Sequence, residues 1–309
     1  VHSNVVSTQT AHALYGGVVP ELASREHQLH IVPVVDTALK EAGISKKELQ
    51  AIAFTRGPGL LGSLIVGVTF AKSLALSLDI PLIDVHHMHA HVLAHFAKDP
   101  KPKFPFLCMT VSGGHTQIIK VNSALDMEVM GETLDDAAGE AFDKTGKMLG
   151  LPYPAGPLID QYAQKGKTKY KFPKSQVKGL DFSFSGLKTA VMYFLKRETN
   201  ANPQFIQEEM PHICASIQST IVETLLEKLS MAVESTGIKQ IAIAGGVAAN
   251  SGLRDGLFEM ATEQKLEAFI PEFEYCRDNA AMIGITAHFK YLENKFCGQD
   301  VSAEARMPF

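Results

Sequence analysis

Apolar residues in this 309-residue chain alternate between helical spacing and short continuous runs. Residues 20–42 carry apolar side chains with helical spacing and precede Gly43, a residue type that often ends helices. An apolar run at 51–55, a helical stretch at about 62–78 and a second run at 81–85 follow. This order predicts the βαβ unit of an α/β protein with helices packed on mainly parallel strands.

The second half of the chain continues this pattern after a segment rich in lysine and proline at residues 98–105. Apolar runs at 106–111 and 117–121 flank a Ser-Gly-Gly-His sequence and predict a hairpin. Beyond the hairpin we expect four helices and a strand, the helices at about 136–149, 185–197, 204–234 and 279–294 and the strand at 240–244.

Length and the segment at 98–105 together predict two lobes. At about 150 residues per domain, the chain is long enough for two apolar cores. We expect a first lobe of residues 1–104, completed by a C-terminal helix at 285–309, and a second lobe of residues 105–284. Residues 1–10 lack the features of a signal peptide and are expected to be a strand entered partway through.

Composition excludes several classes of protein. With 46% hydrophobic and 20% charged residues, the chain is neither disordered nor fibrous. The formal charge of -4 means that nucleic acid would have to meet a local patch or a partner protein. Four single cysteines support no disulfide framework and favour the reducing cytoplasm. The longest apolar run, residues 60–71, is shorter than the roughly 20 residues of a membrane span, so we expect no membrane association.

Histidines cluster directly after the predicted strand at 81–85, at positions 86, 87, 89, 91 and 95. Histidines four positions apart project from one face of a helix, so His87 with His91, or His91 with His95, can supply two metal ligands. Capping or core histidines at a helix start are the structural alternative. Asp278 is a candidate third ligand, and an N-cap role suits it equally well. Met88 stands where the zinc-protease motif HExxH needs its glutamate, which argues against a metalloprotease.

Two Gly-Gly turns, at residues 110–114 and 244–250, each follow an apolar strand. Glycine lets backbone N–H groups approach a phosphate, and a following helix N-terminus adds a favourable dipole. Many tight turns use Gly-Gly, but two in corresponding places suggest two walls of one cleft. Asp136, Glu140 and Asp143 share a helix face that could bind a ribose, a Mg²⁺-phosphate or an ammonium group. The helix dipole also explains acids in a first turn, so Asp143 is the sharper candidate.

Residues 165–178 contain six lysines, with Tyr170 and Phe172 between them. This composition suits contact with a phosphate backbone and stacking on bases. A solvated loop explains it equally well.

Seven short motifs occur in order between residues 57 and 250: GPG (57–59), GVTFAK (67–72), HHMHAH (86–91), VSGGHT (111–116), DDAAGEAFD (135–143), FSFSGLK (182–188) and GGVAAN (245–250). Together they resemble the TsaD family, the tRNA adenosine threonylcarbamoyltransferases. The resemblance runs from about residue 1 to 290. Family members begin with a strand, a turn similar to Ser-Cys-Asp-Glu-Thr and a second strand, whereas this chain starts at the end of that second strand. On this resemblance we expect the given sequence to lack the family's first phosphate loop.

The resemblance implies an α/β, actin-like and sugar-kinase-like fold of two lobes closing on a nucleotide cleft. It implies transfer of a threonylcarbamoyl group from threonylcarbamoyl-adenylate to the exocyclic amine of the adenosine 3′ to the tRNA anticodon, with release of AMP. The implied partners are tRNA, a TsaB-like paralogous subunit and a TsaE-like ATPase. Two alternatives remain within the same fold: an ATP-dependent small-molecule kinase, and a non-catalytic nucleotide-sensing scaffold.

The resemblance also implies site residues. The metal ligands fall on His87, His91 and Asp278, which would accept Fe²⁺, the favoured ion, or Zn²⁺. An adenine nucleotide, either ATP or ADP or the adenylate substrate, falls on a set of nine positions: Thr110, Val111, Ser112, Gly113, Gly114, Asp143, Gly156, Asp160 and Asn250. We assign no catalytic residue beyond the metal site, since the sequence offers no defensible Ser-His-Asp or Cys-His arrangement.

Overall fold

A computed structural model describes residues 1–9, 15, 17–175 and 177–309 of the chain. The chain divides into two compact units, a first unit of Val1–Lys101 with Arg277–Phe309 and a second unit of Pro102–Cys276. From the sequence we expected the divisions after residues 104 and 284. The later division falls earlier because residues 277–284 pack within the first unit, where the Ala281 N–H donates to Asn4 Oδ1 at 3.2 Å.

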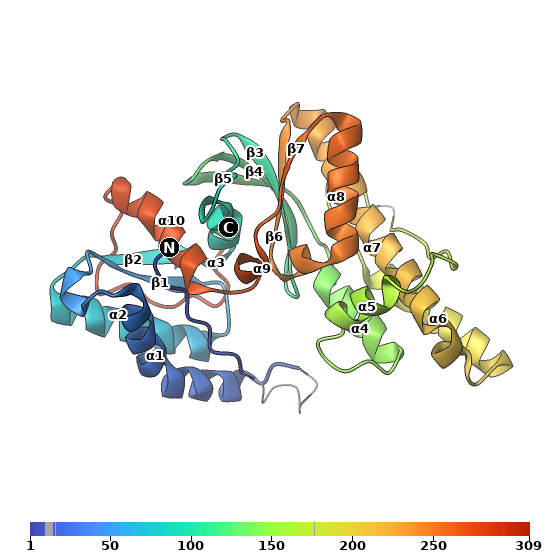
Figure 1. The fold of residues 1–309 in the computed structure, drawn as a ribbon, viewed down its shortest axis with the longest axis horizontal. Coiled ribbons are helices and arrows are strands. Elements are labelled where there is room, and N and C mark those ends of the chain that lie inside the picture. Colours follow the sequence, from blue (N-terminus) through green and yellow to red (C-terminus); the bar gives the residue numbers. More distant parts are fainter. Residues whose placement is uncertain (10–14, 16, 176) are drawn as a thin grey trace. The chain divides into compact units, whose positions relative to one another are not determined.

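The first unit is built on a parallel pair of strands, β1 (Ile52–Gly57) and β2 (Leu82–His86), joined by α2 (Leu61–Leu78). This confirms the predicted βαβ order. The helix α1 (Pro20–Ala42) packs beside α2 and ends at Gly43, as predicted. The strands lie between α2 on one face and α10 (Ala280–Leu292) on the other (Figure 1). Their apolar core contains Phe54, Val68, Ala71, Ala75 and Leu82.

Residues 1–9 form no regular secondary structure, so the strand expected at the start of the chain is wrong for them. Side chains rather than a backbone ladder hold this segment. Ser3 Oγ donates to the carbonyl of Ala38 on α1 at 2.8 Å, and Asn4 accepts from α10 as described above. Residue 10, the last of the expected strand, lies outside the described residues.

The helix α2 carries apolar side chains on its exposed side, among them Leu61, Ile65 and Leu76. By length and composition alone it could cross a membrane, and it is the one helix of the described residues that passes this test. It extends past Lys72, the residue that follows the apolar run at 60–71. Core helices of soluble proteins pass the same test, so length and composition do not place α2 in a bilayer.

The second unit contains a five-stranded mixed sheet in the order β5-β4-β3-β6-β7. The strands β3 (Phe106–Val111), β4 (Thr116–Ser123) and β5 (Asp126–Glu132) are antiparallel, which confirms the predicted hairpin. The strands β6 (Gln240–Ala244) and β7 (Glu267–Phe269) run parallel to β3. The sheet is less parallel than predicted because short turns join β3 to β4 and β4 to β5, and short turns produce antiparallel neighbours.

The larger helices of the second unit lie on one side of its sheet (Figure 1). They are α4 (Ala138–Met148), α5 (Gly156–Ala163), α6 (Ser185–Ala201), α7 (Phe205–Thr236) and α8 (Ser251–Gln264), followed by the short α9 (Phe273–Cys276). Alternate side chains of β3, such as Leu107 and Met109, join the helices in one continuous core. This core fixes the turns at the carboxyl ends of β3 and β6, where most of the predicted nucleotide residues lie.

Candidate functional site

The histidine cluster begins where β2 ends and α3 (His87–Leu93) starts. His86 Nδ1 accepts hydrogen bonds from the N–H groups of Met88 and His89 at 3.2 and 3.5 Å and so caps α3. His86 thus has the structural role weighed for a histidine at this place. The helix then carries His87 and His91 one turn apart, with their ring centroids 4.7 Å apart.

Asp278 meets these two imidazoles from the segment before α10. Its Oδ1 lies 3.1 Å from His91 Nε2 and 3.5 Å from His87 Nε2. The N-cap of α10 is the neighbouring Asn279, whose Oδ1 accepts from the Met282 N–H at 3.0 Å. Asp278 is therefore not the N-cap of α10, which was the alternative role that the sequence left open.

His87, His91 and Asp278 are the one group in the described part of the chain that brings at least three potential metal ligands together, within 4.8 Å of one another. Ligands about 2.1 Å from a tetrahedral ion lie about 3.4 Å apart, so the separations from Asp278 suit a bound ion. The Asp278 side chain is 79% exposed and that of His91 only 3%, which leaves an approach from solvent on the carboxylate side.

The other histidines of the cluster lie outside this trio. His89 packs its ring on those of His86 and Phe309. Burial, together with the charges of His86 and Lys290, lowers the pKa of His89 to about 4, so its imidazole is neutral near pH 7. His95 is buried in the short 3₁₀ turn after α3. Of the two histidine pairs considered, the structure brings the pair at 87 and 91 to a carboxylate.

The first Gly-Gly turn lies between β3 and β4 in the second unit. Thr110 and Val111 are buried in β3, while Gly113 and Gly114 are exposed and have open space around them. Ser112 Oγ accepts from the N–H of Gly114 at 3.3 Å and shapes the turn. The helix that meets this turn is α4, which does not follow it directly in the chain: the Gly139 N–H donates to the Ser112 carbonyl at 3.1 Å.

The second Gly-Gly turn lies directly beside the first, because β3 and β6 are parallel neighbours that pair Thr110 with Ala244. Gly245 has a φ of 89°, and an added Cβ there would lie 2.5 Å from the Val111 carbonyl oxygen. Glycine is thus required at this position for backbone geometry and close packing. The two turns are neighbours on one edge of one sheet, rather than two separate walls.

Asp143, Gly156 and their neighbours form a second part of the predicted nucleotide site. Asp143 Oδ1 accepts from the N–H groups of Ala155 and Gly156 at 2.8 and 3.3 Å. Burial raises the pKa of Asp143, these two N–H groups lower it, and the charge of Glu140 raises it, with a net increase above its ordinary value. Asp143 therefore orients the start of α5 through one oxygen.

The other acids of α4 and its approach are engaged elsewhere. Asp136 and Glu140 both contact Lys144, at 2.6 and 2.9 Å, whereas Asp143 forms no ion pair with a lysine among the residues that the structure describes. Asp135, just before Asp136, accepts hydrogen bonds from the Phe184 and Ser185 N–H groups and so ties the FSFSGLK segment to the approach to α4.

Asp160 and Asn250 both act at the start of α8. Asp160 accepts from the Ser251 N–H at 3.1 Å and from its Oγ at 2.6 Å. Asn250 Oδ1 accepts from the Leu253 N–H at 2.9 Å and is the N-cap of the helix. The protein's own groups therefore use two of the first N–H groups of α8, so this turn offers a ligand fewer backbone donors than the sequence suggested.

The lysine-rich segment at 165–178 is tied to α7. Lys169 and Lys174 pair with glutamates of that helix at 2.7 and 2.9 Å. Tyr170 makes a tilted contact and Phe172 an edge-on contact with the ring of Phe194, at centroid distances of 4.8 and 5.4 Å, and both are partly buried. Both aromatic rings are thus engaged in packing, which favours the structural interpretation. Residue 176 lies outside the described residues.

Known proteins resemble this chain over nearly its whole length. A sequence model of the TsaD family, described as tRNA N6-adenosine threonylcarbamoyltransferase, matches residues 1–285. Proteins of that name from Christiangramia forsetii and Cytophaga hutchinsonii are 59% and 56% identical to it. The alignments cover 99% and 98% of this chain, and 92% and 89% of those proteins.

Solved structures show the fold. A full-length HypF in its phosphate- and nucleotide-bound form superposes with a TM-score of 0.62 at 14% identity, covering 86% of this chain and 42% of HypF. The HypF of T. kodakarensis gives 0.61 at 15% identity, covering 88% of this chain and 44% of that protein. The architecture is the actin-like, sugar-kinase-like α/β fold expected from the sequence. On the strength of the family match and these relatives, the chain belongs to the TsaD family of tRNA N6-adenosine threonylcarbamoyltransferases.

Proposed function

We propose that this chain transfers the threonylcarbamoyl group of threonylcarbamoyl-adenylate to the exocyclic amine of an adenosine in tRNA, the one 3′ to the anticodon. The observation that carries the proposal is the 59% identity, over 99% of the chain, to a relative named for this activity. The amine nitrogen forms a bond to the carbonyl carbon, the bond from that carbon to the phosphate oxygen breaks, and AMP leaves. The attacking amine loses a proton.

The substrate is a mixed carboxylic–phosphoric anhydride and is already activated. The protein therefore has mainly to hold the reactants in line and to stabilise charge on the carbonyl oxygen and the leaving phosphate. In this proposal the adenylate binds the second unit, along the Thr110–Gly114 turn and the Asp143, Gly156, Asp160 and Asn250 positions. The adjacency of the two Gly-Gly turns at the carboxyl ends of β3 and β6 supports this placement, because ligands of open α/β sheets bind there.

A divalent ion would be held by His87, His91 and Asp278, and their separations and mixed imidazole and carboxylate donors fit one. When bound, the ion would supply a Lewis acid for the acyl group. Fe²⁺ and Zn²⁺ both accept such ligands, and Fe²⁺ is our first choice. Within the trio, the buried His91 fixes one ligand in place while Asp278 remains accessible from solvent.

The proposal includes partners and a location. A TsaB-like subunit and a TsaE-like ATPase would act with the chain on tRNA, and no membrane takes part. The cytoplasm suits both the tRNA substrate and the cysteines, which form no disulfide in the described structure.

The transfer is tested by nucleoside mass spectrometry of unmodified tRNA after incubation with threonylcarbamoyl-adenylate, the chain and its partner subunits. We expect threonylcarbamoyladenosine. Its absence with partners of verified activity would overturn the proposal. Phosphate transfer from ATP to a small acceptor would then favour the kinase alternative, and nucleotide binding without turnover would favour the scaffold.

Metal binding is tested separately by elemental analysis of purified protein. We expect about one ion per chain, lost in His87→Ala and His91→Ala. His89→Ala is the matched control, since His89 belongs to the same cluster but lies outside the trio. Full transfer activity in both alanine variants without bound metal would show that the ion assignment is wrong.

A further inference from the structure

Gln218, in the middle of α7, makes a buried hydrogen bond to the side chain of Asn250. The Nδ2 of Asn250 donates to Gln218 Oε1 at 2.8 Å, and each residue is less than one-tenth exposed. The Oδ1 of Asn250 accepts from the Leu253 N–H as the cap of α8. The two ends of the Asn250 amide thus bind to two different helices.

These two hydrogen bonds determine which atom of the Asn250 amide is the oxygen and which is the nitrogen. A backbone N–H only donates, so the Asn250 atom facing Leu253 is its oxygen and the atom facing Gln218 is its NH₂ group. Gln218 must therefore present its own oxygen. Because an amide is planar, the bond to Gln218 also fixes the direction of the second N–H of Asn250. That N–H has no acceptor among the described residues.

We infer that Gln218 is a positioning residue for nucleotide binding: it holds the Asn250 amide so that its second N–H points at an acceptor atom of the bound nucleotide, on the base or the ribose. The inference rests on the proposed function, in which Asn250 contacts the adenylate. Asn250 follows the carboxyl end of β6, where such a ligand is expected. A preset donor loses no rotamer freedom on binding, which increases affinity.

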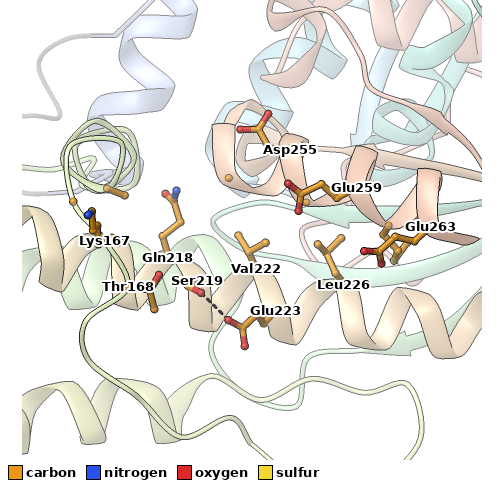
Figure 2. Close-up of a pocket in the computed structure, with 16 residues that line it drawn as sticks. Lys167, Thr168, Gln218, Ser219, Val222, Glu223, Leu226, Asp255, Glu259 and Glu263 are labelled. Atoms are coloured by element: carbon orange, nitrogen blue, oxygen red, sulfur yellow. Dashed lines mark hydrogen bonds between the residues drawn. The ribbon is translucent and has the colours of Figure 1, made fainter.

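Gly252 supplies an independent way to move Gln218. An added Cβ at Gly252 would lie 2.6 Å from Gln218 Nε2. Gln218 also lines an open groove of about 580 Å³ between α7 and α8 (Figure 2). A side chain at 252 would therefore push the Gln218 amide aside into available space, rather than force the two helices apart.

The test measures AMP affinity by isothermal titration calorimetry, with melting temperatures recorded in parallel. Gln218→Met removes the acceptor and Gly252→Ala displaces it, so each should weaken AMP binding about two- to tenfold, the range of one hydrogen bond. Gln218→Glu keeps an acceptor oxygen and should bind AMP better than Gln218→Met. Gly256→Ala is the matched control, because its Cβ would meet the flexible end of Leu226 one turn further along α8.

A second control separates positioning from general stability. Thr224 is buried on α7, and among the described residues its hydroxyl bonds within that helix, to the Thr220 carbonyl. Thr224→Val should therefore lower the melting temperature without changing AMP affinity. In an Asn250→Ser background, which keeps a capping oxygen but lacks the amide, Gln218→Met should have no further effect on affinity. In turnover assays we expect Gln218→Met to raise KM more than it lowers kcat.

Three outcomes would overturn the inference. They are unchanged AMP affinity in both Gln218→Met and Gly252→Ala, equal losses in the two controls, and a wild-type chain that does not bind AMP. If the wild type carries out the transfer and Gln218→Met binds AMP with the same affinity as the wild type, this inference is wrong but the proposed function stands. If Gln218→Met weakens AMP binding but the wild-type chain shows no transfer, the inference is supported and the proposed reaction is wrong.

Discussion

Lys290 on α10 holds the carboxylate of Asp84 on β2, and its replacement by methionine is the sharpest test of how the first unit is stabilised. Lys290 Nζ donates to Asp84 Oδ1 and to the Asp84 carbonyl, both at 2.6 Å. Arg56 Nη1 lies 3.4 Å from Asp84 Oδ2. The side chains of Lys290 and Asp84 are only 21% and 16% exposed, so solvent screens the pair weakly.

The magnitude follows from these contacts. Breaking a buried ion pair by removing one partner costs about 3–5 kcal/mol. In Lys290→Met, Arg56 remains near the Asp84 carboxylate, and that carboxylate is partly exposed to water. We therefore expect Lys290→Met to lower the free energy of unfolding of the first unit by about 2 kcal/mol. Lys295→Met is the control, because Lys295 pairs with Glu293 at the surface and should cost less than about 0.5 kcal/mol.

Hydrogen exchange read by mass spectrometry assays the two units separately. A loss of 2 kcal/mol should speed exchange of the β1 and β2 amides about 30-fold, while α7 peptides of the second unit serve as an unchanged reference. Burial raises the pKa of Asp84, but the hydrogen bonds and charges of Lys290 and Arg56 lower it by more than burial raises it. The pKa of Asp84 in the folded chain therefore lies below its ordinary value.

The sign of the pH effect follows from that lowered pKa. The stabilisation is present above the unfolded pKa of about 3.9 and is lost as the pH falls through the folded pKa. The difference between wild type and Lys290→Met should therefore shrink on acidification below pH ~4. A difference equal to that of Lys295→Met, or one that persists below the folded pKa, would refute the reasoning.

Three further predictions concern the second unit. Asp143→Asn should raise the melting temperature at pH 7 but not at pH ~3. The reason is that the raised pKa of Asp143 makes its charged form unfavourable in the folded chain, and this destabilises the fold only above the unfolded pKa. A higher melting temperature at both pH values would contradict this. Gly139→Ala places a Cβ 2.6 Å from a backbone carbonyl and should cost about 1–3 kcal/mol in urea unfolding, whereas Gly186→Ala, with open space in α6, should not destabilise the chain. Lys228→Met removes the ammonium group that donates to two carbonyls of residues 177–179, and should speed hydrogen exchange in that loop while the β6 amides stay protected.

Local pattern predicted the elements that carry a clear period or a clear stop. The helix α1 begins and ends where the sequence placed it, because helical spacing runs up to a glycine that adopts φ 68°. The strand β7 escaped prediction because three residues show no period. The strand β5 was overlooked although acidic and apolar residues alternate over residues 126–132, which is the signal of a half-exposed strand.

The candidate sites divide in the same way between local and long-range information. The i, i+4 spacing of His87 and His91 placed them on one face of a helix, as the structure has them. Asp278 lies 187 residues from His91, so only tertiary packing, or the family resemblance, selects it among the acids. Gln218 gave no signal at all, since its contact with Asn250 depends on how α7 and α8 pack. The roles of the nucleotide positions and of the ion stay predictions.

The discontinuous first unit implies an order of events during synthesis of the chain. Val1–Lys101 leaves the ribosome first, but the first unit cannot be completed until Arg277–Phe309 has been synthesised, after the contiguous second unit. At about 5–20 residues per second, the intervening segment takes roughly 10–35 seconds. During that time the β-sheet face that α10 later covers stands open, and Asp84 has no lysine partner. The cluster of His87, His91 and Asp278 draws on both stretches, so it is among the last parts of the newborn protein to form.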